Sequence, residues 1–74
     1  MQLIVDQWGS FVGKKSERLR VTVKGQTVSE TPLFDLESVL IACGGVSISA
    51  DAIEACSTAG IMIDFVDWRG APYA

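Results

Sequence analysis

Residues 38–66 contain two apolar runs that are separated by the features of one short helix. The runs, Ser38 to Ala42 and Ile61 to Val66, are each typical of a strand, and the first is uninterrupted, as in strands covered on both faces. Two strands joined through a helix run parallel in one sheet, with a right-handed crossover. A strand-helix-strand crossover is therefore the element that most constrains the fold.

The helix of this crossover is marked at both ends. Ser49 is the predicted N-cap, and Asp51 lies in the first turn, where its charge favours the helix dipole. Gly60 is the predicted C-terminal stop. The helix is expected to face the sheet with an apolar stripe formed by Ala52, Ile53, Cys56 and Ala59.

A glycine pair precedes this helix, as in some phosphate-binding loops, where backbone N–H groups at a helix start face an anion. The segment CGGVSIS lacks the lysine and second glycine of a P-loop, and it lacks the three spaced glycines of a dinucleotide fingerprint. We therefore expect Gly44 and Gly45 to permit the backbone angles of a strand-to-helix turn, with Val46 and Ile48 packing inward.

The first half of the chain reads as short strands joined by tight turns. Residues 3–5 form a β-branched run, and the turn at Gly9-Ser10 is expected to lead directly into a second strand that contains Phe11 and Val12. Residues 18–23 alternate between apolar and polar side chains, as in a half-buried strand.

A hairpin is predicted at Lys24-Gly25, with residues 26–31 as the returning strand and Pro32 ending it. A two-residue turn places Val21 opposite Val28, although the register stays open by one residue. The sequence thus predicts an α+β fold: a small β-rich domain of five to six strands, partly hairpins, with one strand-helix-strand crossover.

Charge is distributed unevenly along the chain. The net charge of −3 argues against a purely nucleic-acid-binding module, because such domains are usually basic. However, five of the six cationic residues lie within residues 14–24; they are Lys14, Lys15, Arg18, Arg20 and Lys24. With Trp8 and Phe11 just before it, this stretch fits phosphate contacts beside a stacking aromatic, but it also fits a solvated strand face that discourages aggregation.

No set of residues in the sequence predicts a catalytic or metal site. The chain has no histidine, so its serines and cysteines lack a general base. Asp64 and Asp67 lie near the end of a predicted parallel strand, but they are too few to hold a divalent cation. Cys43 and Cys56 are predicted to be reduced and buried, since two thiols form neither a zinc site nor a disulfide framework. We therefore predict no catalytic residue, metal ligand or cofactor in this chain.

The opening segment MQLIVDQW has neither a basic start nor a long apolar run, which excludes a signal peptide or membrane span there. With 74 residues, of which 49% are hydrophobic and 20% charged, the composition is that of one small globular domain. The predicted location is the cytoplasm, with no membrane partner.

Three segments together resemble a known family. LIVDQWGSFVGKKSERLRV, TPLFDLESVLIA and GVSISADAIEACSTAGIMIDFVDWRGAPYA resemble, in order, the amino-terminal domain of the CRISPR-associated spacer-acquisition endonuclease and integrase, the first of the Cas proteins. The resemblance implies that residues 1–74 are a single β-rich dimerisation domain. In this family a separate helical domain, which has no counterpart in this chain, carries a DNA endonuclease and integrase site that depends on magnesium or manganese.

The resemblance also implies partners and contact residues. The expected partners are a second copy in a homodimer, DNA, and a small second Cas subunit. Trp8 would stack on the end of a DNA duplex and splay its strands, and the nearest phosphate contacts would be Lys14, Lys15, Arg18 and Arg20. The family domain continues with further strands after the position of Ala74, so an unpaired sheet edge favours a dimer.

The resulting hypothesis is a non-catalytic dimerisation and DNA-positioning domain that is a piece of a longer protein, in which Gly44, Gly45, Ser49 and Gly60 serve the crossover. The alternative is an independent small αβ module that binds a partner protein or small ligand near Gly44 to Ser49. A reading frame that continues into a helical domain with a glutamate, a histidine and an aspartate supports the first hypothesis. A stop after Ala74 supports the alternative.

Overall fold

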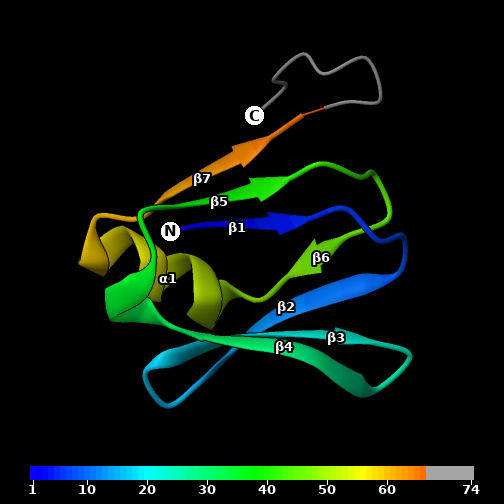
Figure 1. Ribbon diagram of the computed structural model, residues 1–74, viewed down its shortest axis with the longest axis horizontal. Coiled ribbons are helices and arrows are strands. Elements are labelled where there is room, and N and C mark those ends of the chain that lie inside the picture. Colours follow the sequence, from blue (N-terminus) through cyan, green and yellow to red (C-terminus); the bar gives the residue numbers. More distant parts are fainter. Residues whose placement is uncertain (67–74) are drawn as a thin grey trace.

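A computed structural model describes residues 1–66 as two β-sheets and one α-helix (Figure 1). The elements in chain order are β1 (Gln2–Val5), β2 (Ser10–Lys15), β3 (Arg18–Val23), β4 (Gln26–Pro32), the 3₁₀ helix η1 (Leu33–Asp35), β5 (Ser38–Ile41), β6 (Ser47–Ile48), α1 (Ala50–Ala59) and β7 (Met62–Phe65). The α+β class is confirmed, with seven strands in this part of the chain rather than five to six. The turn predicted from Asp67 onward lies outside the described residues.

The first sheet has the strand order β1-β5-β7 and is parallel throughout. Val39 in its centre pairs with Leu3 on one side and Ile63 on the other. The two strands that flank α1 are therefore parallel neighbours, as the crossover predicted. This part of the prediction is confirmed by the pairing of β5 with β7. The physical reason is that parallel strands need a long crossover connection, which is usually a helix.

The second sheet has the order β4-β3-β2-β6 and is built from two successive hairpins, with β6 added in parallel to β2. The predicted turn at Lys24-Gly25 is confirmed. Both residues have positive φ, 54° and 78°, which is the type I′ geometry that matches the twist of a hairpin.

The predicted tight turn between the first and second strands is present, with the Ser10 amide donating to the Gln7 carbonyl at 3.2 Å, but it does not join the two strands in a hairpin. β1 pairs with β5, whereas β2 lies in the other sheet and pairs with β3 and β6. Residues 6–9 carry the chain from one sheet to the other (Figure 1). This arrangement lets Leu3 and Val5 bury their side chains beside the crossover strand β5, which a local hairpin would not allow.

The register of the second hairpin differs from the expected one by a β-bulge. Val21 pairs with Ser29 and Thr22 with Thr27, so Val28 is the extra residue on β4. Val28 is consequently 55% exposed rather than facing Val21 in the core. A bulge of this kind adds one residue to a strand and bends it.

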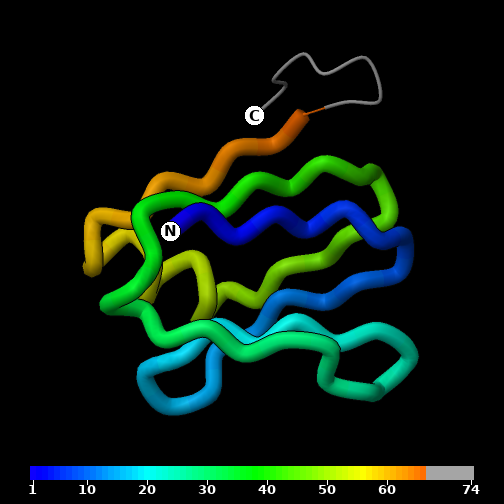
Figure 2. Tube along the Cα trace, viewed as in Figure 1, coloured from blue at the N-terminus to red at the C-terminus, as the bar shows by residue number. Residues whose placement is uncertain are grey.

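The core lies between the two sheets, and α1 packs against β2 and β7 at one end of the molecule (Figure 2). Its buried apolar residues are Leu3, Val5, Val12, Leu19, Val21, Leu33, Leu36, Val39, Ile41, Ala52, Cys56 and Ile61. Val46 and Ile48 pack against this core and are partly buried, as predicted.

Two burial predictions require correction. The β5 segment is not covered on both faces, because Val39 and Ile41 are buried whereas Leu40 is only half-buried and its neighbour Ile4 is 53% exposed. Within α1, Ile53 and Ala59 are exposed, because the helix turns Ala52 and Cys56 toward the core. The face of the first sheet that carries Ile4 and Leu40 is exposed because the second sheet and α1 pack against its other face (Figure 1).

The helix signals of the sequence are confirmed. The Ser49 hydroxyl accepts a hydrogen bond from the amide of Ala52 at 3.1 Å, which satisfies one of the free N–H groups of the first turn. Gly60 ends α1 in the left-handed conformation, with φ 74°. Among residues 1–66, no helix is long and apolar enough to span a membrane.

Candidate nucleic-acid interface

The structure divides the basic stretch between the two faces of the β2–β3 hairpin. Lys15 pairs with Arg18, and Gly13 pairs with Arg20, so these side chains share the face of the second sheet that points away from the core. Lys14 pairs with the buried Leu19 and therefore belongs to the opposite face. Of the four predicted phosphate contacts, three lie together and one does not.

The carboxylate of Glu30 forms ion pairs with both arginines of this outer face. Glu30 Oε1 lies 3.5 Å from Arg18 Nη1, and Glu30 Oε2 lies 3.4 Å from Arg20 Nε. Arg20 Nε is buried and has no hydrogen-bond partner, so its contact with Glu30 is an ion pair without hydrogen-bond alignment. This face carries three positive side chains, Lys15, Arg18 and Arg20, and the negative side chain of Glu30. The net charge of these four residues is therefore +2 (three minus one).

Phe11 lies on the same face and is 44% exposed. Its ring lies over Gly13: a Cβ added to Gly13 would come within 3.0 Å of Phe11 Cε2. A shallow hollow with a volume of about 320 Å³ adjoins the ring; its lining includes Lys15, Arg20 and Thr22. The aromatic ring thus lies on the sheet beside two of the cations, and the sequence signal for this was the small residue two positions after Phe11.

Trp8 occupies a different site, in the turn between β1 and β2. It is 77% exposed, and its indole lies so close to Gly45 that a Cβ there would overlap Cδ1, Nε1 and Cε2 of the ring. The Gly9 amide also donates a hydrogen bond to the Gly45 carbonyl at 2.9 Å. The backbone of the glycine turn therefore contacts the Trp8 indole, while much of the ring remains exposed to solvent.

The glycine pair does form a turn, but its physical reason differs from the expected one. Neither Gly44 nor Gly45 is among the residues with positive φ. Gly45 is needed because Trp8 approaches its Cα, whereas Gly44 has open space around it. The turn also leads first into the short strand β6, and only then into α1.

Trp8 and the Lys15–Arg18 pair lie at opposite ends of β2, whereas Arg20 pairs with Gly13 in its middle. The six residues of β2 lie between the Trp8 turn and the far end of the strand at Lys15, and they span about 17 to 20 Å. By contrast, the pairing of Ser10 with Val23 places the Lys24 turn at the same end of the sheet as Trp8. The order of residues along the chain does not show that Lys24 lies near Trp8, because this proximity depends on the register of the hairpin.

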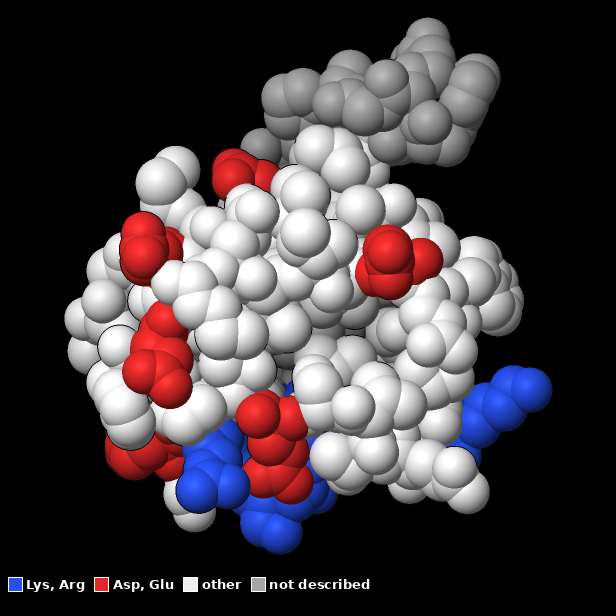
Figure 3. Space-filling view, in the orientation of Figure 1, with Lys and Arg blue, Asp and Glu red and all other residues white. Residues whose placement is uncertain are grey.

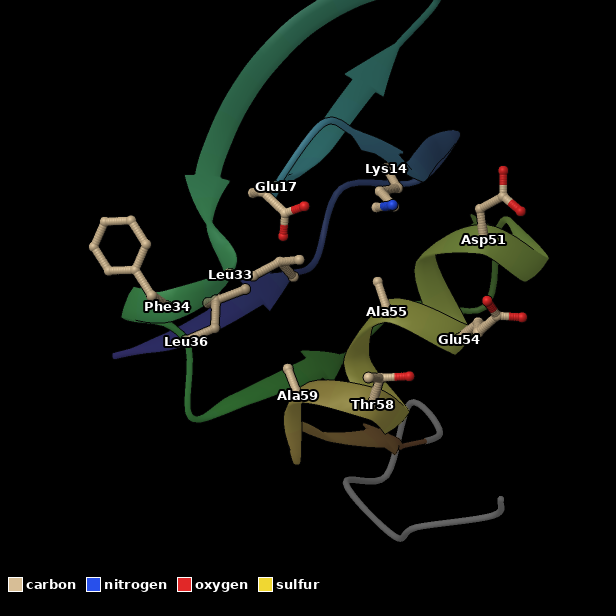
Figure 4. Close-up of a pocket in the computed structure, with 10 residues that line it drawn as sticks. All are labelled: Lys14, Glu17, Leu33, Phe34, Leu36, Asp51, Glu54, Ala55, Thr58 and Ala59. Carbon is tan, nitrogen blue, oxygen red and sulfur yellow. The ribbon is translucent and has the colours of Figure 1, made fainter.

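Lys14 belongs to a separate groove between the β2–β3 hairpin, η1 and α1, with a volume of about 570 Å³ (Figure 4). Leu33, Leu36 and Ala55 form its apolar floor. The groove also contains the carboxylates of Glu17, Asp51 and Glu54. Lys14 therefore shares this groove with three acidic residues, which makes it a weaker candidate for a phosphate contact than the cations of the outer face. Figure 3 shows the blue cationic side chains along the second-sheet side of the visible face, with some red acidic side chains among them and others scattered over a mainly uncharged surface.

The segment from Gly44 to Ser49 uses its polar groups within the fold. The Ser49 amide donates to the Val12 carbonyl at 2.9 Å, and the Ser49 hydroxyl caps α1. The Gly45 carbonyl accepts from Gly9, and β6 pairs with β2. These contacts explain the turn as part of the scaffold rather than as an anion cradle.

The described residues hold no group of three histidine, cysteine, aspartate or glutamate side chains that converge on a metal position. Asp64 lies on β7 opposite Leu40, and Asp67 lies outside the described part of the chain. Cys43 and Cys56 are free thiols; Cys56 is buried as predicted, whereas Cys43 is half-buried. Burial raises the pKa of the Cys56 thiol. These residues do not fit a resident metal ion.

Comparisons with known proteins agree over nearly the whole chain. The family model described as CRISPR associated protein Cas1 matches residues 3–74. The chain is 35% identical, over its full length, to CRISPR-associated endonuclease Cas1 1 of Pyrobaculum aerophilum. It is 38% identical over 97% of its length to CRISPR-associated endonuclease Cas1 1 of Francisella tularensis subsp. novicida. The chain spans 24% and 22% of these relatives, and it aligns with their amino-terminal part.

Solved structures share the fold. A chain of a partial Cas6-RT-Cas1–Cas2 complex superposes over the full length of this chain with a TM-score of 0.91 and 15% identity, using 22% of that chain. A chain of a Cas1–DNA complex superposes over 96% of this chain with a TM-score of 0.78 and 14% identity, using 26% of that chain.

Proposed function

The chain belongs to the Cas1 family of CRISPR-associated proteins, and we propose that it is a non-catalytic domain that dimerises and positions DNA within a longer spacer-acquisition protein. The relatives are named endonucleases and are about four times longer than this chain. In the proposal, the remainder of such a protein holds the magnesium- or manganese-dependent DNA endonuclease and integrase site. Residues 1–74 act as one domain of the scaffold in the cytoplasm.

The partners in this proposal are a second copy of the protein, DNA, and a small second Cas subunit. The structures that share this fold include a complex with Cas2 and a complex with DNA. For the homodimer, the supporting observation is the outer side of the first sheet, where Ile4 and Met62 are 53% and 65% exposed. Apolar side chains on an otherwise uncovered sheet favour association with a partner.

The observation that carries the DNA-positioning part is the placement of Trp8. An aromatic ring that projects from a turn, held against glycine backbone, presents a flat surface to the terminal base pair of a duplex. Stacking on a base contributes about 1 to 3 kcal/mol per base. Lys24 lies at the same end of the sheet, where its charge can meet a phosphate near that terminus.

The test for Trp8 is its replacement by alanine in the longer parent protein. We expect Trp8→Ala to impair integration of DNA with splayed ends while leaving dimerisation intact. Phe34→Ala is the matched control, because Phe34 is an aromatic residue that is 86% exposed on η1, away from this turn. Equal integration by the parent and its Trp8→Ala variant would remove Trp8 from the DNA site.

The test for dimerisation uses this chain alone. Multi-angle light scattering at moderate protein concentration should give the mass of a dimer or a higher oligomer. A monomer would contradict the dimerisation part of the proposal. The independent-module alternative is tested by the reading frame of the gene: continuation into a helical domain with a glutamate, a histidine and an aspartate supports the proposal over that alternative.

A further inference from the structure

We propose that the outer face of the second sheet binds single-stranded DNA, with Phe11 as a stacking platform and Lys15, Arg18 and Arg20 as phosphate contacts. The inference rests on the proposed DNA-positioning function. It adds two statements: the DNA at this face is unpaired, and its bases stack on a residue other than Trp8.

The orientation of Phe11 is the first step. The ring lies over Gly13, the residue two positions along the same strand, and remains 44% exposed. A larger residue at position 13 would lift the ring away from the sheet. One face of the ring therefore rests on the backbone, and the exposed part of the ring is available to a base.

The charges around the ring are the second step. Lys15 and Arg20 line the same 320 Å³ hollow as Phe11, together with Lys14 and Thr22. Arg18 pairs with Lys15 across the hairpin. An aromatic ring flanked by cations along one sheet face is the combination that binds single strands without sequence preference.

Glu30 holds both arginines in the absence of a ligand. Its two oxygens lie 3.5 Å from Arg18 and 3.4 Å from Arg20. Arg20 Nε is buried beside Glu30 without a hydrogen-bond partner, so a phosphate oxygen would contact Arg20 through the terminal nitrogens of its partly exposed guanidinium. Glu30 therefore competes with phosphate for the same two cations.

The position of the ring favours single-stranded over double-stranded DNA. Phe11 lies within the sheet face rather than at a tip, and in a duplex only the terminal base pair exposes its flat surface. A base must be unpaired to lie on a ring in this position. An acidic peptide could meet the cations, but it would gain nothing from the ring, which makes it the comparison ligand.

The experiment measures binding of a fluorescein-labelled oligothymidylate of about twelve nucleotides to the full 74-residue chain by anisotropy at low salt. We expect Phe11→Leu, which keeps an apolar side chain, to weaken binding about tenfold. Lys15→Gln should weaken binding and reduce the salt dependence by about one phosphate contact. Glu30→Gln should strengthen binding, by about twofold or more, because it releases two guanidinium groups.

Lys14→Gln is the matched comparison, since it removes the same charge one residue away, at a position that pairs with the buried Leu19 although it also borders the hollow. We expect it to weaken oligothymidylate binding less than Lys15→Gln does. Circular dichroism melts of each variant verify that the domain is folded. A duplex of the same length and a polyglutamate peptide serve as competitors, and we expect the unlabelled single strand to compete better than either.

The inference would be overturned if Phe11→Leu bound oligothymidylate with the affinity of the original chain, or if Lys14→Gln and Lys15→Gln lost the same affinity. It would also be overturned if Glu30→Gln bound more weakly than the original chain, or if duplex or polyglutamate competed as well as the unlabelled single strand. The proposed function is judged separately by light scattering and by integration with Trp8→Ala. If the chain is dimeric and the parent depends on Trp8, but Phe11→Leu binds oligothymidylate as well as the original chain does, only the single-strand site is refuted. If the chain binds no DNA in any form, the single-strand site is also refuted.

Discussion

The indole of Trp8 lies against the backbone of Gly45, so closely that any side chain at position 45 would overlap the ring. These two residues are far apart in the sequence and belong to the turns that follow β1 and β5, which are neighbouring strands of the first sheet. The contact joins the most exposed part of the proposed DNA site to the loop before the crossover helix.

The first prediction tests this contact with Gly45→Ala. The added methyl group should displace the Trp8 ring into solvent, shift its fluorescence emission to longer wavelength, and cost about 1 kcal/mol of stability. Trp68 is replaced by phenylalanine in every sample so that the emission reports Trp8 alone. Gly44→Ala is the control, because nothing lies within 4 Å of a Cβ at that position. Identical spectra for the two variants would mean that Trp8 does not rest on Gly45 in solution.

The second prediction tests the β-bulge in β4. Val21→Ala should lower the free energy of unfolding by about 2 kcal/mol, since Val21 is buried and the smaller side chain leaves a cavity. Val28→Ala should change it by less than about 0.5 kcal/mol, because Val28 is the exposed extra residue. Urea denaturation of both variants measures the difference. Comparable losses would support the bulge-free register, in which the two valines face each other.

The third prediction concerns the start of α1. Ser49→Ala removes the acceptor of the Ala52 amide, and it should destabilise the domain by about 1 kcal/mol. Ser57→Ala is the matched control: Ser57 is exposed within the same helix, where alanine is the better helix former. The control should be neutral or slightly stabilising in a thermal melt. The N-cap interpretation fails if both variants lose the same stability.

The fourth prediction is a pH dependence that originates at Cys56. Burial raises the pKa of this thiol in the folded chain, so the unfolded chain loses the proton first as pH rises. The contribution of the neutral thiol to stability is complete below the ordinary thiol pKa of about 8.5 and is lost as pH rises toward the higher folded value.

We therefore expect unfolding free energy to fall above about pH 8.5, and to fall less steeply in Cys56→Ala. Ser57→Ala, which removes a non-ionisable exposed side chain from the same helix, should keep the slope of the original chain. Denaturation at a series of pH values provides the measurement. A slope that is unchanged in Cys56→Ala would assign the pH dependence to other groups.

The fifth prediction is that the purified chain does not cleave DNA. With magnesium or manganese added, single-stranded, duplex and splayed substrates should stay intact in a gel assay. The chemical reason is that the chain contains no histidine, and its described acidic residues do not converge on one metal position. Metal-dependent cleavage products that persist through further purification would contradict the non-catalytic assignment.

Local signals in the sequence predicted the local structure well. Ser49 and Gly60 marked the ends of α1, and Lys24-Gly25 marked a hairpin turn, because capping and positive φ depend on the residue itself and its immediate neighbours. The alternation from Arg18 to Val23 likewise indicated which side chains point inward. The parallel pairing of β5 and β7 followed from the helix between them.

Relations between distant segments were decided by the tertiary structure. The pairing of β1 with β5, the bulge that exposes Val28, and the placement of Lys14 opposite Lys15 depend on register, which one extra residue reverses. The sequence by itself determined the Lys24-Gly25 turn, the capped helix, the crossover and the absence of histidine. Only the tertiary structure placed Trp8 on Gly45 and Phe11 beside Arg20, because these contacts arise when separate strands pack into common sheets.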